Sequence, residues 1–132
     1  MTNIKIQYIY NDSWWDFCLD TWNPNTDQYD YSLEDKSDET KQYLTMLRES
    51  SIELGFSGSC KCLNWDKFLS IVLTCLLSHK APYSPIFYNK IHNFFFYFHH
   101  SQSIGFYFKD DSNTIVSILN RARIFYKLEE SR

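Results

Sequence analysis

The sequence predicts an α+β fold, with an antiparallel sheet of about four strands and helices packed over one face of it. Two patterns lead to this prediction. Residues 64–78 carry apolar side chains around most of a helical circumference, as expected for a central buried helix. Residues 94–98 are all aromatic, and residues 104–108 alternate in a way that is typical of a strand. A chain of 132 residues suits a single domain, residues 1–132.

The first third of the chain predicts a strand, a short helix and a loop. Residues 4–10 alternate between apolar and polar side chains, which indicates a half-buried strand. Asp12 or Ser13 then suits the N-cap of a short helix. The apolar side of this helix is expected to comprise Trp14, Phe17, Cys18 and Trp22. Residues 26–36 show no periodicity, so we expect a long surface loop there.

The middle of the chain predicts two longer helices. Ser37 is a good capping residue and two acidic residues follow it, so we expect a helix over residues 38–54 that Gly55 closes. Residues 56–63 are expected to form a connector. The predicted buried helix over residues 64–78 comes next.

The last third predicts paired strands and a further helix. The expected strands are residues 86–88, 91–99 and 104–109, and a hairpin loop over residues 100–103 joins the last two. A helix is expected after residue 112, and residues 124–128 fit either a strand or more helix. We expect the buried helix and the aromatic strands to share one core, with these members: Phe68, Leu69, Val72, Leu73, Leu76, Phe94, Phe96, Phe98, Phe106 and Phe108.

The cysteines predict neither a metal site nor disulfides. Cys60 and Cys62 form a Cys-x-Cys pair, and His99 and His100 are the candidate partners for a zinc site, but the usual zinc-site spacings are absent. We therefore expect free thiols, no metal and no cofactor. The polar N-terminus lacks the apolar core of a signal peptide, and the apolar part of residues 64–78 is too short to span a bilayer, so we expect a cytoplasmic protein without membrane contact.

Charge is distributed unevenly along the chain. Residues 1–54 contain eleven acidic and four basic residues, a net charge of −7, whereas the remainder contains five acidic and nine basic residues, a net charge of +4. Residues 11–39 alone hold nine acidic residues and one lysine, interleaved with tryptophans and tyrosines. A net charge of −3 for the whole chain therefore conceals a strongly acidic segment.

Two interpretations of this acidic segment stay open. It is either a solvated face that keeps the protein soluble, with its tryptophans turned inward, or a binding surface for a basic partner. No pair of its carboxylates is fixed at a catalytic separation. The candidate partner-binding residues are Asp16, Asp20, Trp22, Asp27, Tyr29, Asp30, Tyr31, Glu34 and Asp35.

Histidines on or beside the aromatic hairpin suggest a different function, that of a small hydrolase or nuclease. His92, His99 and His100 lie in this region, and two of them near Tyr97 and Lys109 would suit metal-free acid–base cleavage of RNA. Neighbouring residues on a strand face opposite ways, so His99 and His100 would cooperate only at a turn or bulge. We therefore expect no enzyme.

The aromatic strand also bears a faint similarity to RNA-recognition motifs, whose exposed rings stack on bases. Residues 105–108 carry the glycine and the aromatic side chains of this pattern. Ile104 stands where a basic residue is required, and the chain as a whole is acidic. We therefore expect buried sheet aromatics and no direct binding of nucleic acid.

In size, charge and the composition of residues 14–39, the chain resembles bacterial immunity proteins of contact-dependent growth inhibition systems. This resemblance implies a protein that binds one cognate toxin, often a basic nuclease, and blocks its active site or substrate surface. A phage-type inhibitor that presents carboxylates as a nucleic-acid mimic fits the same charge data. The two differ in the partner, and the sequence leaves both open.

Overall fold

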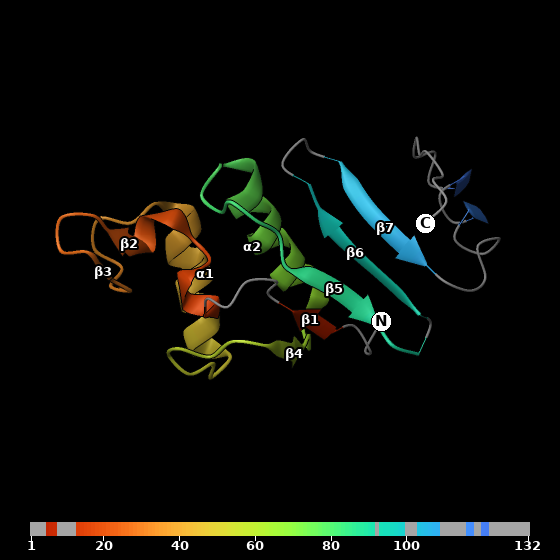
Figure 1. Ribbon diagram of the computed structural model, residues 1–132, viewed down its shortest axis with the longest axis horizontal. Helices are drawn as coiled ribbons and strands as arrows, with labels where there is room; N and C mark the ends of the chain where they lie inside the picture. Colours follow the sequence, from red (N-terminus) through yellow and green to blue (C-terminus); the bar gives the residue numbers. More distant parts are fainter. Residues whose placement is uncertain are drawn as a thin grey trace.

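The computed structural model describes residues 13–91, 93–99 and 103–108, the backbone of residues 5–7, and residues 116, 117, 120 and 121. It shows a mixed α+β fold with two α-helices and antiparallel sheets (Figure 1). The helices and 3₁₀ turns are η1 (Trp14–Asp16), η2 (Leu19–Thr21), α1 (Asp38–Glu49) and α2 (Trp65–Leu77). The strands are β1 (Lys5–Gln7), β2 (Trp22–Asn23), β3 (Gln28–Tyr29), β4 (Ser59–Lys61), β5 (Ile86–Asn89), β6 (Phe94–Phe98) and β7 (Ile104–Phe108).

The main sheet has five strands in the order β4-β1-β5-β6-β7, and every neighbouring pair is antiparallel. The prediction of a single sheet of about four strands was therefore wrong, because β4 lies in the expected connector and β2 and β3 form a separate two-stranded sheet. The all-aromatic strand β6 is an interior strand, as expected, and it pairs with β7 across a hairpin.

Helix α1 begins where the sequence predicts. Ser37 is its N-cap, and its side chain accepts a hydrogen bond from the backbone N–H of Thr40. The helix ends at Glu49 rather than at residue 54. Ser51, two residues after Glu49, adopts a left-handed backbone (φ 58°), which an α-helix cannot include. Gly55 also has a positive φ but lies beyond the helix, in the loop toward β4.

Helix α2 matches the predicted central helix closely in its bounds. Asn64 is its N-cap and Ser78 its C-cap. The expectation that it is covered on nearly all sides was wrong. Ile71, Val72 and Cys75 are its buried residues, whereas Leu77 is 58% exposed. The helix is in contact with α1 on one side and with β5 and β6 on the other, and the rest of its circumference remains accessible.

Residues 14–21 form two 3₁₀ turns instead of the expected short helix. Ser13 caps η1 and forms a capping box with Asp16. Cys18 then adopts an extended backbone, and its carbonyl oxygen accepts hydrogen bonds from both the N–H and the Oγ1 hydroxyl of Thr21. This tight closure by residue i+3 prevents an α-helix from continuing. The expected loop over residues 26–36 contains β3 as well.

The core lies mainly between η1, α1 and α2. Its buried apolar residues are Trp14, Trp15, Phe17, Cys18, Tyr43, Leu44, Met46, Leu47, Ile71, Val72, Cys75, Ala81 and Phe87. Of the aromatic strand residues expected in the core, Phe96 and Phe98 pack against this cluster. Ile104 and Phe106 of β7 lie on the same face of the sheet as Phe96 and Phe98. Ile104 is 58% exposed and Phe106 is also exposed, because α2 covers β5 and β6 and does not reach the edge strand β7. The single core expected from the sequence is thus only partly correct.

Other expectations fall outside the described part of the chain. Residues 116, 117, 120 and 121 have a helical backbone within the helix expected after residue 112. The choice between strand and helix for residues 124–128 lies outside the described residues. No helix in the described ranges has both the length and the apolar character needed to cross a membrane.

Candidate interaction surface

The acidic segment lies at one end of the molecule, around the β2–β3 hairpin (Figure 1). Its six acidic residues in the range 13–37 do not share one environment. Asp16 and Asp20 are partly buried and hydrogen-bonded within the fold, whereas Asp27, Asp30, Glu34 and Asp35 are exposed. The structure thus separates the predicted site residues into an internal group and an external group.

Asp16 is hydrogen-bonded within the segment, whereas Asp20 attaches the segment to the start of α1. One oxygen of Asp16 accepts hydrogen bonds from the N–H and the hydroxyl of Ser13, and the other accepts one from the hydroxyl of Tyr31. Asp20 accepts hydrogen bonds from the N–H and the hydroxyl of Ser37 and from the hydroxyl of Thr40, at the start of α1. These carboxylates are therefore committed to positioning the segment.

The environment of Asp20 favours its ionised form. Partial burial alone would raise the pKa of this carboxyl, but the hydrogen bonds from Thr40 and Ser37 outweigh it and lower the pKa below its usual value. Asp20 therefore stays charged at neutral pH, next to the N-terminus of α1, where a negative charge is also favourable.

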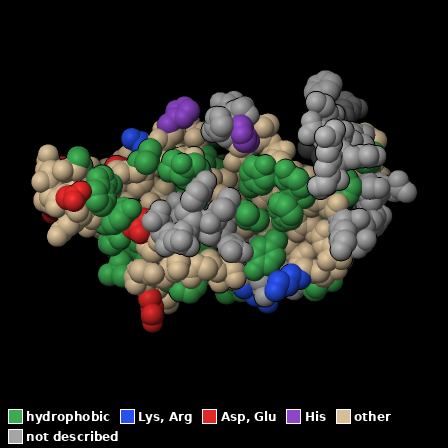
Figure 2. Space-filling model, in the orientation of Figure 1, with side chains coloured by type: hydrophobic (Ala, Val, Ile, Leu, Met, Phe, Trp, Pro, Cys, Tyr) green, Lys and Arg blue, Asp and Glu red, His purple; other side chains and the backbone are tan. Residues whose placement is uncertain are grey.

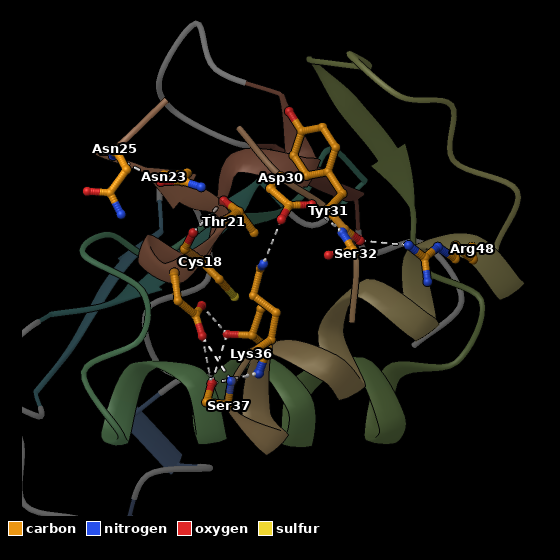
Figure 3. A network of polar contacts seen from close by, with 12 residues as sticks. Cys18, Thr21, Asn23, Asn25, Asp30, Tyr31, Ser32, Lys36, Ser37 and Arg48 are labelled. Carbon is orange, nitrogen blue, oxygen red and sulfur yellow. Dashed lines mark hydrogen bonds and ion pairs between the residues drawn. The ribbon is translucent and has the colours of Figure 1, made fainter. Parts of the chain in front are cut away.

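Tyr31 lies between the internal and the external groups. Its ring packs edge-on against Trp15, at 5.6 Å between ring centroids, and stacks on Tyr29 at 6.1 Å. Partial burial and the hydrogen bond to Asp16 raise the pKa of its hydroxyl. Figure 3 shows Arg48 reaching the same residue from α1, where its Nη2 donates a hydrogen bond to the carbonyl oxygen of Tyr31 at 2.7 Å. Tyr31 therefore supports the surface from below.

Trp22 and Tyr29 form an exposed aromatic pair on the hairpin. They are cross-strand partners, and their rings meet edge to face at 4.9 Å between centroids. Trp22 is 41% exposed and Tyr29 is 42% exposed, so both leave much apolar area in contact with water. The N–H of Asp30 donates to the carbonyl oxygen of Thr21 at 2.7 Å, which fixes the end of the hairpin.

The hairpin and the loop that follows it also carry four exposed carboxylates, those of Asp27, Asp30, Glu34 and Asp35. Asp30 accepts a hydrogen bond from the N–H of Ser32, and its carboxylate lies 3.6 Å from the Nζ of Lys36 (Figure 3). The Ser32 hydrogen bonds, and then Lys36, lower the pKa of Asp30. The side chain of Lys36 is only 5% exposed, whereas that of Asp30 is 51% exposed. We call Trp22, Asp27, Tyr29, Asp30, Glu34 and Asp35 the acidic aromatic surface.

The space-filling view supports this description. Figure 2 shows acidic atoms beside hydrophobic ones at the end of the molecule that carries the hairpin. Asp27 and Asp35 both have a left-handed backbone, with φ values of 56° and 59°. These turns hold the two residues at the surface in defined positions.

The described residues do not bring the hairpin histidines together in a catalytic arrangement, because only one of the three is described. His99 lies directly after β6 and is exposed, whereas His92 and His100 lie outside the described residues. Among the residues that the structure describes, no group of three or more His, Cys, Asp or Glu side chains is placed to hold a metal ion. The expectation of a metal-free protein without a cofactor stays a prediction.

Comparisons with known proteins returned nothing: no family model, no curated protein and no solved structure matches this chain. The function must therefore be argued from the surface itself.

Proposed function

We propose that this protein is a small cytoplasmic inhibitor of the immunity type, which binds a basic protein toxin through the acidic aromatic surface and neutralises it. The resemblance to immunity proteins of contact-dependent growth inhibition systems leads to the same class, with a nuclease as the expected toxin. The proposal includes no catalytic activity and no direct contact with nucleic acid.

One observation carries the proposal: a fixed, exposed Trp22–Tyr29 pair lies on the same hairpin and loop as four exposed carboxylates. In a purely solvated acidic face, the tryptophan would be expected to turn inward, as Trp14 and Trp15 do. Aromatic side chains that are already rigid lose little entropy on binding and are common energetic centres of interfaces. The surrounding carboxylates would attract a basic partner and accelerate encounter.

The charge prediction is tested with a pair of matched double variants. Asp30→Lys/Glu34→Lys reverses two acids of the acidic aromatic surface. Glu49→Lys/Glu53→Lys makes the same charge change elsewhere, and each double variant includes one acid that is paired with a lysine. We expect the first variant to slow association with the toxin at low salt by at least about tenfold, and the control to have a much smaller effect.

The aromatic prediction uses Trp22→Ala. Loss of a central anchor should mainly accelerate dissociation and weaken binding by at least about 2 kcal/mol. Tyr107→Ala removes an equally exposed aromatic side chain from the main sheet and should leave binding unchanged. The candidate toxin is the product of the gene adjacent to this one, and it is obtained by co-purification with this protein. The association and dissociation rates are measured by surface plasmon resonance. Unchanged rates for both test variants would mean that the segment is a solvated face.

The identity of the partner separates this proposal from its alternative. A nucleic-acid mimic would bind a host defence complex or a nucleic-acid-binding protein in place of a toxin. Co-expression of the adjacent toxin gene, with cell survival as the readout, would then show no protection by this protein.

A further inference from the structure

A groove lies beside the acidic aromatic surface, where the end of α2 meets the end of β6. Its volume is about 340 Å³. The lining residues are Leu19, Leu73, Leu76, Leu77, His79, Ala81, Pro82, Ser84, Phe98, His99 and Ser103. This volume is at the low end of the range of about 300–1,000 Å³ for ligand sites, so it suits one large side chain better than a folded element.

The apolar residues of the groove are unusually accessible for their type. Leu19 is 55% exposed and Leu77 is 58% exposed, and both belong to the lining. Figure 2 shows hydrophobic atoms next to histidine atoms on the face of the molecule that it presents. Large aliphatic side chains that are gathered in a concave site and left in water are typical of an interaction site.

The groove and the acidic aromatic surface are continuous along η2. Leu19 opens this turn and lines the groove, and Trp22 follows the turn directly. The N–H of Leu19 donates a hydrogen bond to the carbonyl oxygen of Lys80 at 2.7 Å, which attaches η2 to the loop after α2. A partner that covers Trp22 would therefore also reach the groove.

The charges at the rim of the groove favour a cation. The C-terminus of α2 carries the negative end of its helix dipole and lies at the groove. The hydroxyl of Ser78, between two lining residues, donates a hydrogen bond to the carboxylate of Glu39 at 3.3 Å. Lys80 is the opposing cation on the same loop.

We infer that this groove receives one large apolar side chain of the partner, flanked by lysine or arginine residues. The inference rests on the proposed function, because it assigns a second contact to the same basic partner. The groove would supply the buried anchor, and the C-terminus of α2 together with Glu39 of α1 would favour the flanking basic residues.

The test uses peptides and therefore does not need the toxin. The probe is the peptide Lys-Lys-Phe-Lys-Lys, added to the full chain with methyl-labelled leucines and followed by NMR. We expect saturable shifts of the leucine methyls of the groove and none at Leu54 and Leu63, which are exposed elsewhere. The peptides Lys-Lys-Ser-Lys-Lys and Glu-Glu-Phe-Glu-Glu should bind at least about tenfold more weakly.

Two variants locate the binding. Leu77→Gln changes an exposed groove residue and should weaken binding of the basic peptide by at least about tenfold, whereas Leu63→Gln should not. Thermal melts check that both variants fold. The absence of groove shifts, equal binding of the acidic peptide, or no effect of Leu77→Gln would each overturn the inference. The proposed function fails separately, if the Asp30/Glu34 and Trp22 variants leave toxin binding unchanged.

Discussion

At the scale of single residues, similar carboxylates have different roles in this protein. Asp20 and Asp27 lie in the same acidic segment, yet Asp20 accepts three hydrogen bonds from Ser37 and Thr40, whereas Asp27 is exposed in a left-handed turn. The difference follows from which hydroxyls and N–H groups the start of α1 places beside each side chain. It has measurable consequences for stability.

Asp20→Asn should destabilise the protein by about 1–2 kcal/mol at neutral pH, because the hydrogen bonds to a charged acceptor are weakened. The pKa of Asp20 is lowered in the folded state, so its stabilisation is fully present above the unfolded value of about 4 and is lost as the pH falls through the folded pKa. In urea melts, the difference in the free energy of unfolding between the wild-type protein and Asp20→Asn should therefore be smaller at acidic pH than at neutral pH.

The control for this prediction is Asp27→Asn. Asparagine tolerates the left-handed backbone of residue 27, so this variant should leave the free energy of unfolding unchanged at both pH values. A loss of stability in Asp20→Asn that is equal at both pH values would show that the charge of Asp20 is not the source.

The four cysteines should differ in reactivity. The Sγ atoms of Cys18 and Cys75 lie 3.9 Å apart in the buried core, and their mutual contact and burial raise the pKa of Cys18 far above its usual value. Burial also raises the pKa values of Cys60 and Cys62, which are half-buried. Thiol titration should show no fast-reacting cysteine in the native protein and four in denaturant. Fewer than four thiols in denaturant under non-reducing conditions would indicate a disulfide.

At the scale of elements, Phe87 is the central side chain in the contact between α2 and the sheet. Phe87 of β5 is completely buried and packs against Trp65 and Phe68 of α2 and against Phe96 and Phe98 of β6. These aromatic contacts connect β5 to α2 and to β6. The helix and the sheet are therefore expected to be coupled through this residue.

Phe87→Ala should cost about 3–5 kcal/mol, the usual range for a buried phenylalanine, as measured by urea unfolding. Phe95→Ala is the matched control, because Phe95 lies on the opposite face of the sheet. Phe95 stacks on Tyr107 and is 38% exposed. We expect it to cost about 0.5–1.5 kcal/mol. Equal losses for the two variants would contradict the placement of α2 over β5.

At the scale of the whole molecule, one buried cluster joins elements from both halves of the chain. It runs from Trp14 and Trp15 in η1 through α1 and α2 to Phe87 in β5. The buried polar groups of η1 are satisfied by distant residues, since the indole N–H groups of Trp14 and Trp15 donate to the carbonyls of Gly58 and Glu53. These contacts should make the described elements a single cooperative unit.

We therefore expect one two-state unfolding transition. Tryptophan fluorescence, which reports mainly on η1 and α2, and far-UV circular dichroism, which reports on the helices and the sheet, should give the same midpoint in urea. Two separate midpoints would show that the sheet and the η1–α1 region unfold independently, and the chain would then contain more than one domain.

Local patterns in the sequence were sufficient for several elements. The start of α1 at Ser37, both ends of α2 and the strands β5, β6 and β7 were predicted because capping residues and side-chain periodicity act within a few residues of each other. The acidic and aromatic character of the segment that carries the acidic aromatic surface was also evident from composition. Short-range physical chemistry determines these features.

Tertiary contacts decided the rest. Strand β4 has little pattern of its own and is defined by pairing with β1, and the 3₁₀ turns replace a helix where the Cys18 carbonyl meets Thr21. The hydrogen bonds of Asp20 depend on where the start of α1 lies, which no local pattern encodes. The groove has no signal in the sequence, because it joins Leu19, the end of α2 and Phe98, which only the packing of distant segments brings together.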